Sequence, residues 1–431
     1  MPEPRELIAQ MDDARARTLT LVQDLDAQQL MGPKLPTVNP LRWEIGHAAY
    51  FHEYWVLRQH LGEAPGRPDV DRLYDSISIA HDTRWDLPLP PLEETLAYMD
   101  GVNQRVRQHL EQDPPDAQRD YLAQYAVFHE DMHTEAFTYT RQTLAYPPPA
   151  IGTPADPDWR AGGLEGDAEI PGGTFLLGAR PEDEGFVFDN EKWAYPVEIA
   201  PFRIARAAVS NAEFAGFVDN GGYRRPEFWD EEGWAWRSKA GLEHPVYWRR
   251  GANGWEWRHF DRWEPLPPQA AVIHVSWYEA KAWCRWAGRR LPTEVEWEVA
   301  AAGEPSADGT TLAPVKRRYP WGDSPPDPSR ANLDGRALGT IDVGALPAGD
   351  SAFGCRQMLG NAWEWTDTTF GPYPGFTPDM YRDYSMPLFG QTRVLRGGCW
   401  ATRSRLIRNT WRNYYGPDRN DVFAGFRTCA V

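Results

Sequence analysis

The chain has 431 residues, with 45 lysines and arginines against 62 aspartates and glutamates, so its formal net charge is 45 − 62 = −17. This length predicts two or three domains. The acidic charge argues against nucleic acid or an anionic membrane as a partner, because phosphate binding needs a basic face. The longest apolar runs also fall far short of the ~20 residues that cross a bilayer.

The cysteines and the first residues bear on the cellular compartment. The four cysteines are far apart in the sequence, which disfavours a disulfide framework and is typical of a reducing compartment. The N-terminal segment MPEPRELIAQMDDARARTL is charged throughout, unlike a secretory signal. We predict a cytoplasmic protein, and we expect it to be a monomer or a weak dimer.

Residues 1–148 have the pattern of a helical domain. Apolar side chains recur at helical spacing in four segments, and the short connections favour an up-and-down four-helix bundle. Asn39 and Pro40 precede the second segment, which predicts that Asn39 caps this helix and that Pro40 opens it. The predicted helices are 6–25, 41–61, 91–110 and 116–144.

The rest of the chain differs in composition. Residues 149–168 are rich in proline, glycine and aspartate, which predicts a linker or an ordered crossover. From residue 169 to 431 the segments are short and are separated by glycine, proline and most of the 21 tryptophans. We predict strands at 173–178 and 393–396, and two helices at 210–220 and 276–288. The buried face of the second of these helices is expected to carry Trp277, Ala280, Trp283 and Cys284.

Two histidines in the fourth predicted helix are candidate metal ligands. His129 and His133 are four residues apart, so they lie about 40° apart on one helix face. A third ligand has to come from another helix, and His47 is the natural candidate, since bundle cores carry such sites between facing helices. His52 falls on a different face, where we expect a structural or surface residue. Glu135 is predicted to point away and is not taken as a ligand.

Other interpretations of these histidines stay open. A pair at this spacing is often a core or surface pair that binds nothing. The same letters match the H-E-x-x-H helix of zinc proteases, with Glu130 as base, but that motif needs a third ligand soon after it and the next histidine is His244. Three imidazoles without a carboxylate or thiolate suit Fe(II), Cu(II) or Zn(II), and the sequence does not choose among them.

Six motifs in the second half carry a family resemblance. Together they resemble the formylglycine-generating-enzyme/sulfatase-modifying domain, a variant of the C-type-lectin fold. The first half resembles the DinB-like four-helix bundle, through the H-x3-H-x-E pattern at His129, His133 and Glu135. In this order and at this length, the two halves resemble the ergothioneine-type non-haem iron sulfoxide synthases. The six motifs are PGGTF (171–175), LPTEVEWE (291–298), YPWG (319–322), MLGNAWEW (358–365), RVLRGG (393–398) and GFR (425–427).

The resemblance implies an α+β fold and a reaction. A DinB-like bundle (1–148) would carry the metal, and a formylglycine-generating-enzyme-like domain (169–431) would close over it and supply substrate contacts. Members of the family use Fe(II) and O2 to join a sulfur donor to an imidazole carbon of hercynine, the trimethylated betaine of histidine. The family's three iron ligands correspond to His47, His129 and His133. This is the same trio that the spacing indicates.

The resemblance also implies substrate contacts in the second half. Asn413 and Tyr414 are expected to line the hercynine pocket. A trimethylammonium has no N–H donors, so aromatic faces recognise it, and Tyr414, Tyr415 and Trp411 provide such faces. Some members use a tyrosine as a proton or hydrogen donor, for which Tyr381 is our candidate.

The donor pocket departs from the pattern of the family members that use gamma-glutamylcysteine. Those members hold the donor's carboxylates with two arginines three residues apart, of which only Arg84 is present here, while His81 takes the place of the other. Tyr415 replaces an aspartate that pairs with the donor's amino group, and Met132 replaces a glutamine. Because unpaired buried charges are costly, these changes predict a neutral donor.

The predicted activity follows from this departure. We expect the selenoneine synthase branch, which joins hercynine to a selenosugar through a C–Se bond with Fe(II) and O2. The alternative is an ergothioneine-type sulfoxide synthase that forms a C–S bond with a thiol such as gamma-glutamylcysteine or cysteine.

Two rival classes of protein remain. A formylglycine-generating enzyme needs a pair of reactive cysteines that bind copper, but Cys399 and Cys429 are 30 residues apart and the bundle would have no role. Cys399 is instead expected to be a buried small apolar residue. A non-catalytic lectin-like binding module would retain no stoichiometric iron and would lose nothing on replacement of His129 by alanine.

Overall fold

The computed structural model describes residues 2–183 and 185–431. It divides into two compact units, each described by itself below. Unit 1 comprises Met1–Ile151 and Glu184–Phe186, and unit 2 comprises Gly152–Asp183 and Val187–Val431. Within the described residues, no helix combines the length and the apolar character needed to cross a membrane.

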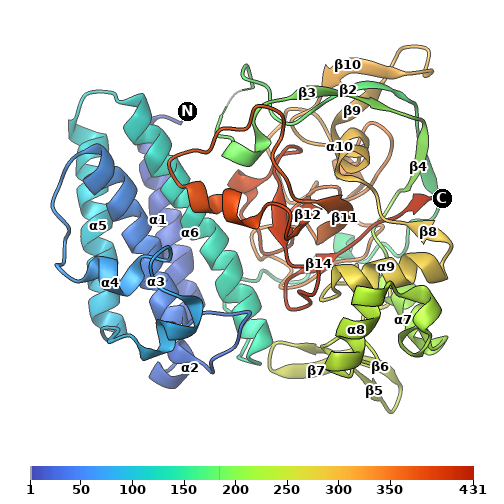
Figure 1. The fold of residues 1–431 in the computed structure, drawn as a ribbon, viewed down its shortest axis with the longest axis horizontal. Helices are drawn as coiled ribbons and strands as arrows, with labels where there is room; N and C mark the ends of the chain where they lie inside the picture. The colour runs from blue at the N-terminus through green and yellow to red at the C-terminus, as the bar shows by residue number, and fades with distance from the viewer. Residues whose placement is uncertain (1, 184) are drawn as a thin grey trace. The chain divides into compact units, whose positions relative to one another are not determined.

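Unit 1 is helical, and its four long helices correspond to the four predicted segments (Figure 1). The second predicted helix changes its winding at residue 53 and continues as a π-helix, in which Leu61 N donates to Val56 O at 3.1 Å. The elements of unit 1 are α1 (Pro4–Val22), α2 (Ala27–Met31), α3 (Leu41–His52), the π-helix η1 (Glu53–His60), α4 (Val70–Tyr74), the 3-10 helix η2 (His81–Asp86), α5 (Leu92–Gln112) and α6 (Ala117–Thr143).

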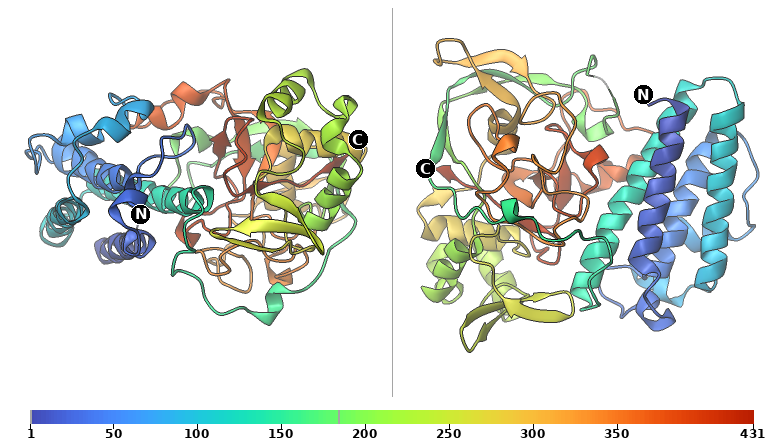
Figure 2. Two further views of the ribbon diagram at one scale, coloured as in Figure 1. Left: turned by 90° about the horizontal axis from the view of Figure 1, so that it is seen from below. Right: turned by 180° about the vertical axis from the view of Figure 1, so that it is seen from behind.

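The long helices form a four-helix bundle whose neighbour order differs from the predicted up-and-down arrangement. Helices α1 and α3 each pack against both α5 and α6, so the order around the bundle is α1, α5, α3, α6. Figure 2 shows these blue and teal helices side by side. Helices α1 and α3 are therefore opposite each other, because the connection of residues 23–40, which includes α2, is long enough to cross the end of the bundle.

Local sequence accounts for most of the helix boundaries in unit 1. Asp116 caps α6, since its Oδ1 accepts from the main-chain N–H groups of Gln118 and Arg119 at 3.0 Å each. The prediction that Asn39 caps α3 is wrong. Pro40 is the N-cap residue, and the Asn39 side chain bonds to Glu44 instead.

Unit 2 combines small sheets with four short helices. Its two four-stranded sheets have the orders β1-β4-β15-β8 and β13-β12-β11-β14. Smaller sheets pair β2 with β3, β9 with β10, and β5 with β6 and β7. The strands are β1 (Asp167–Ile170), β2 (Gly173–Leu177), β3 (Tyr195–Ile199), β4 (Phe202–Ala205), β5 (Trp248–Gly251), β6 (Gly254–His259), β7 (Arg262–Pro265), β8 (Arg289–Arg290), β9 (Gly303–Pro305), β10 (Leu312–Lys316), β11 (Trp363–Thr369), β12 (Arg393–Arg396), β13 (Asn413–Tyr415), β14 (Ala424–Gly425) and β15 (Cys429–Ala430).

The helices of unit 2 begin at side-chain caps. Ser276 and Glu279 form a capping box at α9, and Thr293 and Glu296 form one at α10. The predicted count of two helices is wrong, because α8 and α10 are also present. Their apolar residues do not recur on one face over enough turns to be recognised. The helices are α7 (Asn211–Asp219), α8 (Glu231–Ala240), α9 (Trp277–Trp286) and α10 (Glu294–Ala302).

Buried ion pairs connect the sequence motifs of unit 2. Arg396 of the RVLRGG motif binds Glu294 at 2.9 Å and Glu298 at 2.5 Å, both from the LPTEVEWE motif. Arg427 of the GFR motif binds Glu364 of the MLGNAWEW motif at 2.6 Å. All of these side chains are at most 3% exposed. Because breaking such a pair leaves an uncompensated buried charge, loss of one partner should destabilise unit 2.

Candidate metal centre

Three histidines of unit 1 come together in the bundle interior. His47 lies on α3, and His129 and His133 lie one turn apart on α6. One ring nitrogen of each falls within 4.8 Å of those of the other two. The ring centroid of His47 is 5.0 Å from that of His129 and 5.1 Å from that of His133. Neighbouring helices of the bundle therefore supply the predicted trio to one point.

Burial disfavours the protonated form of two histidines of the trio, His47 and His129. Burial lowers the pKa of both His47 and His129 well below the ordinary value, and the nearby charge of His133 lowers each pKa further. A neutral imidazole has a free lone pair for a metal, so His47 and His129 do not need to lose a proton before they bind one.

Tyr74 determines which nitrogen of His47 is available. Nδ1 of His47 is 2.8 Å from the main-chain oxygen of Tyr74, which can only accept, so Nδ1 carries the proton and Nε2 keeps the lone pair. This contact requires a glycine at position 46, because a Cβ there would lie 2.1 Å from Cε1 of the Tyr74 ring. Gly46 thus lets Tyr74, at the end of α4, approach α3, the helix that carries His47.

Aromatic rings enclose the trio. Trp43 stacks on His47 with centroids 4.8 Å apart, and Phe51 stacks on His129 at 3.9 Å. The guanidinium carbon of Arg84 lies 3.9 Å from the Trp43 ring centroid. These walls restrict the imidazole rotamers, which preorganises the ligands for a metal.

The surroundings of His52 and Glu130 argue against the protease interpretation. His52 is an interior residue, 1% exposed, with Nε2 3.5 Å from Oε2 of Glu130. Glu130 is fully buried, and its Oε1 accepts from Thr18 Oγ1 at 2.7 Å. Because Glu130 bonds to Thr18 deep in the core, it is not placed to act as the base of a zinc protease.

The candidate donor residues of unit 1 lie on η2 and α6. Nε2 of His81 is 2.8 Å from the main-chain oxygen of Val38. Arg84 donates from Nη1 to Oδ1 of Asn39 at 2.7 Å. Met132 is half-buried beside His133 on α6.

The candidate substrate residues of unit 2 lie on and near β13. The side-chain oxygen of Asn413 accepts from Tyr414 N at 2.8 Å. The Tyr414 hydroxyl donates to the main-chain oxygen of Tyr384, and burial raises the pKa of Tyr414 well above its ordinary value. Tyr415 is half-buried beneath the guanidinium of Arg419, whose central carbon is 5.1 Å from the ring centroid.

Two other aromatic candidates differ in accessibility. Trp411 is only 4% exposed and packs against Trp363 with centroids 4.9 Å apart, so it offers little free face to a ligand. Tyr381 precedes the 3-10 helix of Arg382–Tyr384 and is half-buried.

Sequence reasoning missed a carboxylate next to the trio. Glu44 lies with one carboxylate oxygen, Oε1, 3.3 Å from Nδ1 of His133, and the same oxygen accepts from Asn39 Nδ2 at 3.0 Å. The spacing offered a signal, because Glu44 precedes His47 by three residues and such pairs share a helix face.

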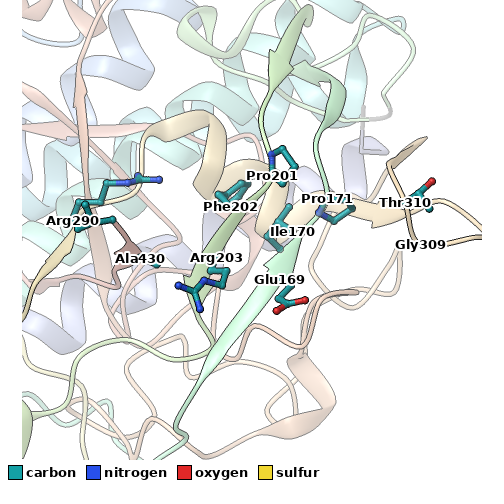
Figure 3. Close-up of a pocket in the computed structure, with 11 residues that line it drawn as sticks. Glu169, Ile170, Pro171, Pro201, Phe202, Arg203, Arg290, Gly309, Thr310 and Ala430 are labelled. Atoms are coloured by element: carbon teal, nitrogen blue, oxygen red, sulfur yellow. The ribbon is translucent and has the colours of Figure 1, made fainter.

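A pocket of about 600 Å³ lies elsewhere, in unit 2 (Figure 3). Residues from β1 and β4 form its wall, together with Arg290 and the chain end at Ala430 and Val431. None of the candidate site residues lines it, so this pocket is separate from the candidate site.

The alternative of a formylglycine-generating enzyme with reactive cysteines also loses support, since Cys399 is fully buried.

Comparison with known proteins matches each half of the chain to a known family. Residues 10–137 match the DinB superfamily, and residues 159–430 match the sulfatase-modifying factor enzyme 1-like domain. The chain is 40% identical to a hercynine oxygenase of Mycolicibacterium thermoresistibile over 434 residues, covering 99% of this chain and 95% of that protein. It is 39% identical to a hercynine oxygenase of Mycobacterium tuberculosis, covering 99% of both. A formylglycine-generating enzyme of Streptomyces coelicolor is 33% identical, covering 67% of this chain and 96% of that protein.

The fold and these matches define an oxidoreductase enzyme with a DinB-type bundle followed by a sulfatase-modifying-factor-like domain. This confirms the predicted fold class. Within that class, the chain belongs to the family of the hercynine oxygenases, since the similarity extends over nearly its whole length.

Proposed function

We propose that this enzyme is a selenoneine synthase, which uses iron(II) and O2 to form a C–Se bond between the imidazole ring of hercynine and a selenosugar. Relatives named hercynine oxygenases that match 99% of the chain support hercynine as the acceptor. The neutral selenium donor is supported by the bonding of Arg84 in unit 1, which is the observation that carries the choice.

His47, His129 and His133 would hold the iron. Three imidazoles suit a borderline divalent ion, and the lowered pKa values of His47 and His129 favour binding at neutral pH. When bound, iron(II) supplies the oxygen chemistry and a common centre for the substrates. The stacked rings of Trp43 and Phe51 would hold two of the ligands in place.

Arg84 is already engaged, which disfavours a charged donor. Its guanidinium donates to Asn39 and covers Trp43. At the companion position His81 binds the Val38 main-chain oxygen. A dipeptide such as gamma-glutamylcysteine brings two carboxylates and an ammonium, and at these two positions Arg84 is the one permanent cation for the two carboxylates. A sugar presents hydroxyls that need only scattered hydrogen bonds, so it suits these groups better.

The remaining residues have roles in substrate binding and proton transfer. Asn413, Tyr414 and Tyr415 would bind hercynine, with aromatic faces toward its trimethylammonium group. Tyr381 would transfer a proton during the reaction, and Met132 would border the donor.

Donor competition tests the proposal directly. The full chain, loaded with iron(II) without oxygen, is mixed with hercynine and either a selenosugar, gamma-glutamylcysteine or cysteine, and O2 is then admitted. We expect a product with the selenium isotope pattern in mass spectra only with the selenosugar. His129→Ala should abolish turnover with every donor. Turnover with gamma-glutamylcysteine but not with the selenosugar would refute the selenium assignment.

A matched variant probes the donor position itself. His81→Arg restores the missing arginine, so it should raise turnover with gamma-glutamylcysteine relative to the parent.

A C–S bond-forming sulfoxide synthase is the second candidate. The 40% identity to hercynine oxygenases along the whole chain favours it. In the same assay, this candidate predicts a sulfoxide product from a thiol donor and none from the selenosugar.

A further inference from the structure

A line of hydrogen bonds leads from η2 of unit 1 to His133. Arg84 Nη1 donates to Asn39 Oδ1 at 2.7 Å, and Asn39 Nδ2 donates to Glu44 Oε1 at 3.0 Å. The same Glu44 oxygen is 3.3 Å from Nδ1 of His133. The line therefore joins η2, the segment before α3, α3 itself and α6.

The chemistry of its members fixes the direction of every bond. A guanidinium can only donate, so Asn39 must turn its oxygen to Arg84 and its NH2 group to Glu44. A carboxylate can only accept, so the proton of His133 must sit on Nδ1. This leaves the Nε2 lone pair of His133 for a metal, as the Tyr74 oxygen does for His47.

The Glu44 carboxyl group is buried next to His133. Its side chain is 3% exposed, and in the part of the chain that the structure describes no donor reaches Oε2. The other oxygen, Oε1, accepts from Asn39 and lies against His133. A buried carboxylate with such partners is costly unless a cation lies nearby. A divalent ion on Nε2 of His133 would supply that charge through the ring.

We infer that Glu44 is a positioning residue for the metal ligand His133, and that Asn39, which is itself bound by Arg84, holds Glu44 in place. The inference rests on the proposed metal site and deepens it. Glu44 selects the His133 tautomer, orients the ring and offsets part of the metal's charge. Arg84 thereby belongs to the support of the metal, in addition to its proposed place beside the donor.

Metal binding by the full-length apoprotein tests this inference. Co(II) is the probe, because its visible absorption reports the ligand geometry, and a competing chelator gives the affinity. Glu44→Gln keeps the size of the side chain and removes the charge, and it should weaken Co(II) binding roughly 10–100-fold and change the spectrum. Asn39→Ala should weaken binding by a smaller factor. Anaerobic release of Fe(II) to a chelator should be faster than in the parent protein, by a larger factor in Glu44→Gln than in Asn39→Ala.

The control is another buried glutamate of the bundle. Glu53 is fully buried and accepts from Tyr98 and Arg105, away from the trio. Glu53→Gln should lower the melting temperature of the apoprotein yet leave Co(II) affinity and spectrum unchanged.

The outcomes separate the two proposals. A parent chain that binds no stoichiometric metal refutes the proposed function and the inference together. A parent that binds metal, with a Glu44→Gln variant of equal affinity and spectrum, refutes only the role of Glu44. If Glu44→Gln does not fold, Asn39→Ala decides, and an affinity equal to that of the parent overturns the inference.

Discussion

Gly46 offers a sharp test of how the fold positions a metal ligand. A Cβ at this position would lie 2.1 Å from Cε1 of Tyr74, whereas ordinary contacts begin at 3.4 Å. In Gly46→Ala the Tyr74 ring must therefore retreat by about 3.4 − 2.1 = 1.3 Å. If the main chain follows, its hydrogen bond to His47 lengthens from 2.8 Å to about 2.8 + 1.3 = 4.1 Å and is lost.

The energetic cost follows from the same contact. Tyr74 is 1% exposed, so it cannot move into solvent. Overpacking costs about 1–3 kcal/mol, and the lost hydrogen bond adds about 1 kcal/mol. The gain of about 1 kcal/mol from replacing a helical glycine offsets part of this. We expect net destabilisation of unit 1 by about 1–3 kcal/mol, together with weaker metal binding.

Gly101 on α5 provides the matched control. A Cβ there meets nothing within 4 Å, so Gly101→Ala should stabilise the bundle by up to about 1 kcal/mol and leave metal affinity unchanged. Urea unfolding of the two apoproteins, followed by far-UV circular dichroism, measures the stability, and Co(II) titration measures the affinity. Equal shifts of the same sign in both variants would refute the reasoning from the Tyr74 contact.

Three further predictions concern other parts of the molecule. Burial lowers the pKa of His274 from 6.5 to about 3, so the unfolded chain binds a proton that the folded chain refuses between these values. Stability should therefore fall as the pH is lowered from about 6.5 to 3, by up to about 5 kcal/mol, and His274→Asn should flatten this dependence in denaturant titrations. Asp116→Ala removes the cap of α6 and should cost about 1 kcal/mol in thermal unfolding. Cys399→Ala should leave turnover and metal content unchanged, because the fully buried thiol has no redox role in the proposed reaction.

Each of these has a contradicting result. An unaltered acid profile in His274→Asn would place the acid sensitivity in other groups. A melting temperature unchanged by Asp116→Ala would mean that solvent replaces the cap. Lost turnover in Cys399→Ala, with the fold intact, would revive a chemistry based on cysteine.

Local pattern was enough to predict several features of this chain. The four long helices follow from apolar spacing, because one turn of helix repeats every few residues and needs no distant partner. The histidine pair of α6 follows from the same periodicity. The burial of Trp277, Ala280, Trp283 and Cys284 on α9 was predicted correctly for the same reason.

Elements without a long apolar repeat were missed. Helices α8 and α10 are short, and the strands β5 to β7 mix tryptophan with arginine and glutamate, so hydrophobic period alone does not reveal them. The role of Asn39 was also misjudged. An asparagine before a helix is a good cap in isolation, but here Arg84 and Glu44 compete successfully for its side chain.

By itself, the sequence determined the helical first half, the motif-rich second half and the three histidines that could share a metal. Only the tertiary structure decided the neighbour order of the helices, which brings α3 and α6 together, and the partners that select a tautomer for two of the ligands. The physical reason is the separation in sequence over which each interaction acts. Helical periodicity acts over a few residues, whereas the Tyr74 oxygen reaches His47, and Glu44 reaches His133, only after segments far apart in the chain have packed.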